Sequence, residues 1–294
     1  METFELKYFL AVAQRENVSR AAEAVHVSPG SLSKAVSRLE RELKTTLFFK
    51  VGRGIKLTPA GLLLKKRAAE LVQLEEDVRF ELGGGSAALN VFVSSEEILQ
   101  TFYGVAIAKK TAALFPEART QFWIRSESKA LEQVLDGEAQ LALITSDPPP
   151  GTISKTIARV QFQTCASPGH PLVKRFGARG TIPIRELLMH PFVSPDSTIL
   201  GRISKSTSTD GWRDDKFPRQ IKYKVYSLKL MENLIREGLA LGYLPDYFVA
   251  SAGLVPLKIS GCPYYCEQTV RVIAKAPITL GWLRTFWTSS GPKL

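Results

Sequence analysis

The sequence predicts a mixed α/β protein in three parts: a small helical module with a β-hairpin, one long helix, and a larger region of two α/β halves. Apolar residues recur at helical spacing through the first 43 residues, and two short strand patterns follow them. A helical run over residues 59–82 then ends at the sequence GGGS. From residue 87 onward, strand and helix patterns alternate, which is typical of α/β folds.

Charge is unevenly distributed along the chain. The formal net charge is +11 over 294 residues, and residues 1–67 hold 13 lysines and arginines against 6 acidic residues. Residues 68–86 reverse the sign, with 5 acidic residues against one arginine. A basic end of this kind indicates a nucleic acid or an anionic membrane surface as the partner.

Other protein classes are disfavoured by the same survey. No apolar run reaches the roughly 18 residues of a membrane span, and the first residues lack a signal-peptide core. A soluble, cytoplasmic protein without a membrane partner is therefore expected. The three cysteines, Cys165, Cys262 and Cys266, form no CxxC pair. We accordingly expect no metal site and no cofactor.

The first two helices are short and pack by one face each. The first is expected over residues 4–15, because four apolar residues follow the i, i+3, i+4, i+7 spacing: Leu6, Phe9, Leu10 and Ala13. Ser19 is expected to cap the second helix, which buries Ala21, Ala22 and Val25.

The third helix carries the clearest start signal. Ser28 is the expected N-cap and Pro29 the first helical residue, where a missing N–H costs nothing. Its buried face consists of Leu32, Val36, Leu39 and Leu43, and its opposite face of Gly30, Ser33, Lys34, Ser37 and Arg41. Two helices joined by a tight turn, the second with a short-chained, basic outer face, predict a helix-turn-helix that enters the DNA major groove.

Residues 47–58 predict two short strands around a turn at residues 51–54, from which Lys50, Arg53 and Lys56 project. Such a wing reaches backbone phosphates or the minor groove. Charge runs are more often a solvated face, but the ordered succession of helices, cap, turn and wing favours double-stranded DNA. The candidate DNA contacts are Ser28, Pro29, Gly30, Ser31, Ser33, Lys34, Ser37, Arg38, Lys50 and Arg53.

The stretch RAAEAVHVSPGSLSKAVSRLERELKTTLFFKVGRGIKLTPAG resembles the winged helix-turn-helix of the LysR-type transcriptional regulators. Matching positions are Ala21, Ala22, Ser33, Leu39, Glu40, Leu43, Leu47, Phe48, Leu57, Thr58 and Gly61. Three places depart from the family pattern: Pro29 replaces a frequent glutamine, Lys44 a glycine, and Phe49–Lys50 an acidic or polar residue and an arginine. Loss of the glutamine amide removes one potential adenine reader, so the half-site is expected to differ.

The helix over residues 59–82 begins after Thr58 and spans roughly 36 Å. It resembles the linker helix of that family, which implies pairing with a second copy into a homodimer, and of such dimers into a homotetramer. The resemblance also implies a contact with RNA polymerase. A core helix of a single domain is the alternative. We expect residues 1–58 to form the DNA-binding domain and residues 59–86 the linker helix and hinge.

Residues 87–294 predict two βαβαβ units. Strands are expected over residues 89–94, 119–125 and 141–144, with helices over 98–115 and 128–136, and a similar order recurs over 192–244. Ser126 precedes Gly137 by eleven residues, as Ser227 precedes Gly238. The region resembles the LysR-type effector domain, whose two subdomains are related in fold to type 2 periplasmic binding proteins. The expected subdomains are residues 87–160 with 267–294, and residues 161–266.

Such paired subdomains bind a small-molecule effector between them, at strand ends and helix N-termini. The candidates are polar residues at those ends: Ser94, Ser95, Ser126, Ser128, Thr145, Ser146, Asp196, Thr198 and Ser227. Glu96 and Glu97 would oppose an anion if they faced the cleft. In contrast, residues 87–294 carry 25 basic against 17 acidic residues, which favours an anion. The residues leave the sign of the effector open.

Two other protein classes are disfavoured relative to a regulator. A solute-binding protein would need a signal peptide and no helix-turn-helix. An enzyme would need a catalytic constellation, whereas His26, His170 and His190 lie far apart in sequence and no GxSxG, HExxH or Walker motif occurs. Cys262 and Cys266 could respond to oxidants, as in peroxide-sensing family members, but a structural role is the preferred interpretation.

Overall fold

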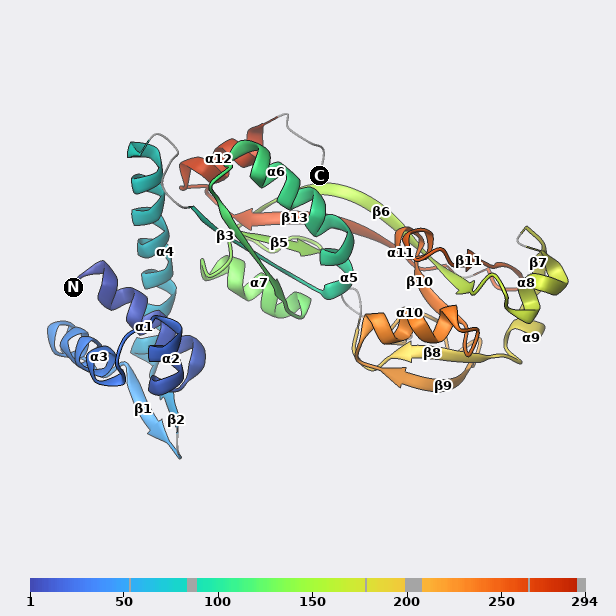
Figure 1. Ribbon diagram of the computed structural model, residues 1–294, viewed down its shortest axis with the longest axis horizontal. Coiled ribbons are helices and arrows are strands. Elements are labelled where there is room, and N and C mark those ends of the chain that lie inside the picture. Colours follow the sequence, from blue (N-terminus) through green and yellow to red (C-terminus); the bar gives the residue numbers. More distant parts are fainter. Residues whose placement is uncertain (53, 84–88, 178, 199–207, 264, 290–294) are drawn as a thin grey trace.

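The computed structural model describes residues 1–294 except residues 53, 84–88, 178, 199–207, 264 and 290–294. Figure 1 shows three parts along its long axis: the N-terminal module at the left, the upright helix α4 beside it, and two α/β subdomains extending to the right. None of the described helices is both long enough and apolar enough to cross a lipid bilayer.

The N-terminal module consists of α1 (Thr3–Arg15), α2 (Val18–Ala24) and α3 (Pro29–Leu43). The predicted cap of α2 was wrong: Asn17 occupies the N-cap, and its side chain accepts a hydrogen bond from the Arg20 N–H. Asn and Ser are equally good N-cap residues, so residue preference alone does not tell whether the helix begins at Asn17 or at Ser19. Leu32 is fully buried between the helices, whereas Leu43, expected on the same face, is 39% exposed at the end of α3.

Strands β1 (Phe48–Val51) and β2 (Gly54–Leu57) form the predicted wing as an antiparallel pair. Glu40 of α3 fixes its start, since its carboxylate accepts hydrogen bonds from the N–H groups of Leu47 and Phe48. Lys44 ends α3 in the left-handed region, at φ 51°. Only glycine adopts that region without steric cost, so this departure from the family pattern carries local strain.

Helix α4 (Pro59–Leu82) has the predicted bounds, with Thr58 as its N-cap. Gly61 lies so close to the module that a Cβ there would sit 2.2 Å from the Leu47 carbonyl oxygen. At the other end, the Asp77 carboxylate accepts hydrogen bonds from the N–H groups of Gly281 and Trp282, which begin α12 (Gly281–Thr288). Helix α4 is thus fixed against both the module and the effector region.

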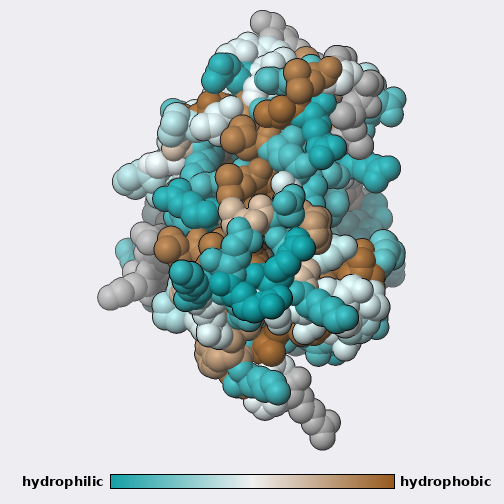
Figure 2. Space-filling view, turned by 90° about the vertical axis from the view of Figure 1, so that its left-hand side faces the viewer, coloured by the Kyte–Doolittle hydropathy of each residue, from teal (hydrophilic) through white to brown (hydrophobic). Residues whose placement is uncertain are grey.

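The outer side of α4 is apolar and exposed. In the space-filling view of this side (Figure 2), hydrophobic residues gather in a stripe over the upper half of the face, where Figure 1 places α4. The large apolar side chains of α4 that remain exposed are Leu62, Leu63, Leu71, Leu74, Val78 and Leu82. The glycines 84 and 85 expected to form a hinge lie outside the described residues.

The first subdomain is a sheet covered by helices, and the predicted strands are present within one or two residues. Its parallel strands are β3 (Asn90–Ser95), β4 (Arg119–Ile124) and β5 (Leu141–Ile144). The helix expected over residues 98–115 is continuous but has three segments: α5 (Glu97–Leu99), a π-helical turn η1 (Gln100–Gly104) and α6 (Val105–Leu114). Helix α7 (Glu127–Leu135) precedes β5.

Two long antiparallel strands, β6 (Thr152–Ala166) and β13 (Glu267–Lys275), connect the subdomains. They belong to a seven-stranded sheet of order β10-β6-β13-β5-β3-β4, with β11 added to β6. The second subdomain adds α8 (Pro171–Phe176), β7 (Thr181–Pro183), α9 (Ile184–Leu187), β8 (Pro191–Pro195), β9 (Gln220–Val225), α10 (Leu228–Arg236), β10 (Gly242–Pro245), α11 (Asp246–Ser251), β11 (Val255–Pro256) and β12 (Lys258–Ser260).

The internal repeat holds at its helix caps. Ser126 and Ser227 are the N-caps of α7 and α10, and Gly137 and Gly238 follow these helices with φ of 77° and 72°. The second unit is less complete than predicted, because the described residues between β8 and β9 contain turns and no helix. Parallel strands β8 and β9 nevertheless pair directly.

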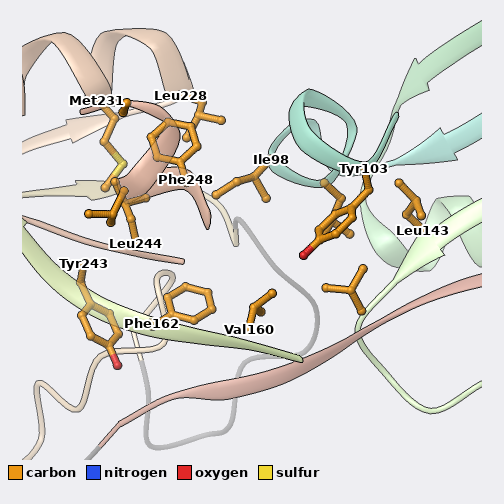
Figure 3. Close-up of a cluster of buried hydrophobic side chains, with 14 of the residues drawn as sticks. Ile98, Tyr103, Leu143, Val160, Phe162, Leu228, Met231, Tyr243, Leu244 and Phe248 are labelled. Carbon is orange, nitrogen blue, oxygen red and sulfur yellow. The ribbon is translucent and has the colours of Figure 1, made fainter. Parts of the chain in front are cut away.

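One apolar core runs through both subdomains. Figure 3 shows Leu228 and Met231 of α10 beside Phe248 and Leu244, with Ile98 and Tyr103 of the first subdomain opposite them. Tyr247 of α11 donates a hydrogen bond from its hydroxyl to the Ile98 carbonyl, 3.0 Å away. The two subdomains therefore touch at the base of the space between them.

Candidate DNA interface and effector cleft

The outer face of α3 presents the predicted small and basic side chains to solvent. Ser28 caps the helix by accepting a hydrogen bond from the Ser31 N–H at 3.0 Å, and the two hydroxyls lie 2.8 Å apart. The residues of this face are all exposed: Gly30, Ser31, Ser33, Lys34, Ser37, Arg38 and Arg41. Leu32, Val36 and Leu39 hold the opposite face against α1 and α2. The helix is thus presented by its outer side, the arrangement that a major-groove reader requires.

Arg38 differs from its neighbours on this face. Its guanidinium forms an ion pair with the fully buried carboxylate of Glu5 and lies 5.6 Å from the centre of the Phe4 ring. Burial alone would raise the pKa of Glu5, but the hydrogen bond and the charge of Arg38 lower it. Arg38 therefore ties α3 to α1, and about half of its side chain remains exposed.

The wing offers further cations. Lys50 on β1 and Lys56 on β2 are both exposed, one on each strand of the hairpin. Gly52 supplies the positive φ, 55°, that the turn requires. The third predicted contact, Arg53, lies outside the described residues.

A cavity of about 130 Å³ lies between the two α/β subdomains. We call it the effector cleft. The first subdomain contributes Glu96, Glu97, Ile98 and Ile124; the second contributes Pro195, Ser197, Thr198, Val225, Tyr226, Ser227, Leu228 and Met231. It lies where the strand ends of β3, β4, β8 and β9 meet the N-termini of α5 and α10, as the pattern predicts for a small-molecule site.

Glu96 is the most perturbed carboxyl in the cleft. Its Oε1 accepts a hydrogen bond from the N–H of Glu127, the first residue of α7, at 3.0 Å. Burial, reinforced by the nearby Glu127 carboxylate, raises the pKa of Glu96 to about 7. Glu127 itself is buried and accepts hydrogen bonds from the Thr145 N–H and hydroxyl and from the Ser146 N–H.

Only some of the predicted effector residues lie at the cleft. Thr198 and Ser227 line the cleft, and Asp196 adjoins it between Pro195 and Ser197. Ser94 is buried and donates a hydrogen bond to Gln133 of α7, and Ser95 donates to the Glu96 carbonyl. The remaining four serve α7: Thr145 and Ser146 bond Glu127, and the exposed hydroxyls of Ser126 and Ser128 lie 3.2 Å apart.

Several lining residues had no signal in the sequence. Ile98, Ile124, Leu228 and Met231 are apolar residues at strand or helix ends, and nothing in their spacing separates them from the core. Tyr226 is 85% exposed at the rim, where its hydroxyl donates a hydrogen bond to Asp196. The fold shows that Tyr226 is exposed at the cleft, and the sequence gives no sign of this.

The fold brings together two histidines that are distant in sequence. The rings of His170 and His190 lie 5.0 Å apart, and burial lowers the pKa of His170 to about 4. His170 accepts a hydrogen bond from the Leu172 N–H and so caps α8. Neither lines the effector cleft. Cys262 and Cys266 are half-buried, with the Cys266 sulfur 3.9 Å from Gln268 Nε2.

The raised pKa of Glu96 predicts that the stability of the folded protein falls as the pH rises. Its protonated form fits the folded state, so this stabilisation is complete below its ordinary pKa of 4.5 and is lost as pH rises through about 7. Glu96→Gln keeps the acceptor oxygen and cannot ionise. The melting temperature of this variant should therefore exceed that of the unmodified protein at pH 8, and the two should converge near pH 5. Glu117→Gln, at an exposed carboxyl elsewhere, is the control, and equal pH profiles for all three proteins would contradict the assignment.

Comparison with protein-family models divides the chain as the fold does. Residues 4–62 match the model of bacterial regulatory helix-turn-helix proteins of the lysR family. Residues 103–277, more than half of the chain, match the LysR substrate binding domain.

Curated relatives match over different lengths. The regulator YofA of Bacillus velezensis is 43% identical over 74 residues, which cover 25% of this chain and 26% of YofA. The transcriptional activator IlvY of Salmonella typhimurium is 31% identical over 147 residues, 49% of each chain. The matched part of the chain thus spans about half or less of the length of these two relatives.

Solved structures match nearly the whole chain in fold. ArgP from Mycobacterium tuberculosis has a TM-score of 0.64 at 18% identity, covering 96% of this chain and 93% of its own. LysG from Corynebacterium glutamicum with bound effector Arg has a TM-score of 0.61 at 18% identity, covering 98% and 95%. CbnR complexed with its target DNA has a TM-score of 0.60 at 20% identity and covers 98% of each chain.

Proposed function

Because this chain belongs to the LysR family of bacterial transcriptional regulators, we propose that it binds a specific double-stranded DNA site and that a small molecule in the effector cleft controls this binding. One observation carries the proposal above all: a capped helix with an exposed small and basic face is followed directly by a two-stranded wing. The proposal assigns the protein no catalytic step, and it places the protein in the cytoplasm, where its DNA is.

In the proposed complex, α3 enters the major groove and the wing contacts the backbone. Ser33 and Lys34, one turn beyond the cap, approach the base edges, while Lys50 holds phosphate. Arg38 acts mainly by orienting α3, because its guanidinium already pairs with Glu5. The CbnR structure with target DNA shows that a protein of this fold can bind DNA in full-length form.

Two lysines should affect DNA binding differently. Lys34→Ala should weaken binding to the specific site by about 1–3 kcal/mol and relax discrimination at one base position. Lys50→Ala should weaken all sequences alike and reduce the salt slope of log K by about one. Fluorescence anisotropy over a range of salt concentrations measures both effects. Lys174→Ala, an exposed lysine of α8, is the control; unchanged specific binding by Lys34→Ala would contradict the proposal.

The proposed domains are residues 1–58 for DNA binding, 59–86 as linker and hinge, and 87–294 for the effector. Within the last, we divide residues 87–160 with 267–294 from residues 161–266. The pairing of β6 with β13 supports this division, because Gln161 and Glu267 are register partners at the start of β13, on the side of the second subdomain. Both connecting strands therefore cross at the proposed boundary.

We propose that α4 pairs with a second copy, giving a homodimer, and that dimers can join into a homotetramer. Its exposed leucines support this, since an apolar stripe on a charged helix marks an interaction surface. A helix of 24 residues spans about 36 Å, which suits half-sites about 34–36 Å apart. Contact with RNA polymerase is the remaining partner proposed.

The effector is proposed to act by shifting the assembly between two arrangements. Differential affinity for the two states supplies typically about 1–3 kcal/mol of coupling. The effector cleft supports this role because it is built from both subdomains, so a ligand there contacts both at once. LysG, of similar fold, was solved with arginine bound.

A further inference from the structure

The effector cleft of this chain is acidic, and this bears on the effector that the proposed function requires. Glu96 and Glu97 line its first wall, and Asp196 adjoins its second. Among the residues that the structure describes there, the lining includes neither lysine nor arginine. The described lining of the cleft therefore carries carboxylates and no basic side chain.

The N-terminus of α7 beside the cleft already holds a carboxylate of the chain, and one N–H group of α10 is bound by its cap. Helix N-termini bind anions through free N–H groups. At α7 the Glu127 N–H donates to Glu96, so a carboxylate of the chain itself occupies that position. At α10 the Ser227 hydroxyl accepts from the Leu230 N–H. An anionic effector at the α7 terminus would have to displace Glu96 and approach its charge.

Two arginines described near this region, Arg125 and Arg271, bind other groups. Arg271 donates hydrogen bonds to the carbonyls of Thr145 and Ser146 and pairs with Asp147. Arg125, next to Ile124, donates to the Ile124 carbonyl. Neither guanidinium pairs with Glu96.

The rest of the lining is apolar and the space is small. Ile124, which is 55% exposed, and Leu228 contribute hydrocarbon surface. A cavity of about 130 Å³ is below the roughly 300–1,000 Å³ that is usual for drug-sized ligands. The shape thus suits a short carbon chain with one polar end.

We propose that the effector is a small cation, a short aliphatic amine whose ammonium group pairs with Glu96 and whose carbon chain contacts Ile124 and Leu228. The inference rests on the proposed function for the use of the cleft, and it adds the chemical class of the ligand. Buried or half-buried carboxylates without a cation are costly, so an ammonium partner would relieve an existing cost.

Binding of such a cation should depend on pH through Glu96. Among the described residues, the charged and titratable groups around it are Glu97 on its own helix, Glu127 on α7, and Asp196 and Tyr226 across the cleft. The ammonium pairs with the ionised carboxylate, whose pKa is about 7 before binding. Affinity should therefore rise about tenfold between pH 6 and pH 8, whereas an alkyl ammonium does not titrate there.

The test uses isothermal titration calorimetry on the full chain with three matched probes: n-butylammonium, butanoate and butan-1-ol. At pH 8 we expect n-butylammonium to bind more tightly than butan-1-ol, and butanoate most weakly. Glu96→Gln should lower the affinity for n-butylammonium at least tenfold and remove its pH dependence. The control Glu117→Gln, at an exposed carboxyl outside the cleft, should behave as the unmodified protein.

The inference is overturned if n-butylammonium fails to bind, if butanoate binds more tightly, or if Glu96→Gln binds n-butylammonium as well as the unmodified protein does. These outcomes leave the proposed function standing as long as Lys34→Ala still alters specific DNA binding. If the unmodified protein shows no sequence-specific DNA binding at all, the proposed function fails instead. The two experiments therefore separate the two failures.

Discussion

Replacing Leu71 and Leu74 by glutamate should split the proposed assembly into monomers and weaken binding to a two-half-site DNA by about 10²–10⁴-fold. Both side chains lie on α4 and are 44% and 46% exposed in the single chain. Pairing of two α4 helices would remove this apolar surface from water, at about 25 cal/mol per Å². Two buried carboxylates on each copy would reverse that gain.

The same substitutions should leave the single chain folded. Leu71 and Leu74 line a cavity of about 480 Å³ between α4 and the loop before α12, so longer polar side chains have space there. The contacts that fix α4, from Asp77 to the start of α12 and from Glu70 to Lys275, are unaffected. Circular dichroism should therefore be unchanged.

Sedimentation equilibrium measures the assembly, and anisotropy with one-site and two-site DNA measures the loss of linked binding. Met189→Glu, at an apolar side chain that is 79% exposed in the second subdomain, is the matched control. An unchanged sedimentation profile for the Leu71→Glu, Leu74→Glu protein would place the interface on another surface.

Local signals in the sequence predicted the elements from α1 to β5, but not the long strands β6 and β13. Ser28 and Pro29 begin α3, Thr58 and Pro59 begin α4, and the β5 strand is apolar throughout. Each of these depends on residues within one helical turn or one strand. The wing was predicted for the same reason, from two short strand patterns around a turn at residues 51–54.

Contacts between distant residues were beyond that reasoning. Arg38 has the exposure expected of a DNA contact, but its partner Glu5 is 33 residues away. Ser94 faces Gln133 and Thr145 faces Glu127, so both hydroxyls are used inside the first subdomain. Periodicity predicts the face of a strand, but it does not tell which helix covers that face.

The chemistry of the effector cleft also depends on contacts between distant residues. The sequence suggested Glu96 and Glu97 as obstacles to an anion and left the sign of the effector open. Only the fold places both in one cavity with Thr198 and Ser227, and only it shows Glu96 at the N-terminus of α7. The chemistry of the site follows from that juxtaposition.

Arg219→Met should lower the free energy of unfolding of the effector region by about 3–5 kcal/mol. The Arg219 side chain is fully inaccessible to solvent and pairs with Asp210, also fully inaccessible, and with Asp214. Its guanidinium lies 5.3 Å from the Phe192 ring centre and 5.2 Å from that of Trp212. Methionine would fill much of the volume but leave the Asp210 carboxylate buried without its cation.

The geometry explains why lysine would replace Arg219 only in part. Nη1 and Nη2 of Arg219 donate to the two oxygens of Asp210 at 2.7 and 3.1 Å, and Nε and Nη2 donate to Asp214, both at 2.9 Å. Lysine offers a point charge in place of this planar fork. Arg219→Lys should therefore recover only part of the loss, less than a simple charge count implies.

An exposed ion pair of the same subdomain gives the control for this prediction. Arg175 and Glu186 pair at 2.8 Å, but the Arg175 side chain is 69% exposed. Arg175→Met should cost no more than about 1 kcal/mol. Urea denaturation followed by tryptophan fluorescence compares the variants directly, because Trp212 lies against Arg219. Equal midpoints for Arg219→Met and Arg175→Met would show that the buried cluster does not hold this part of the fold. Arg219→Met should also disturb the effector cleft more than Arg175→Met does. Thr209, next to Asp210, donates its hydroxyl to the carbonyl of Pro195, and Pro195 lines that cavity.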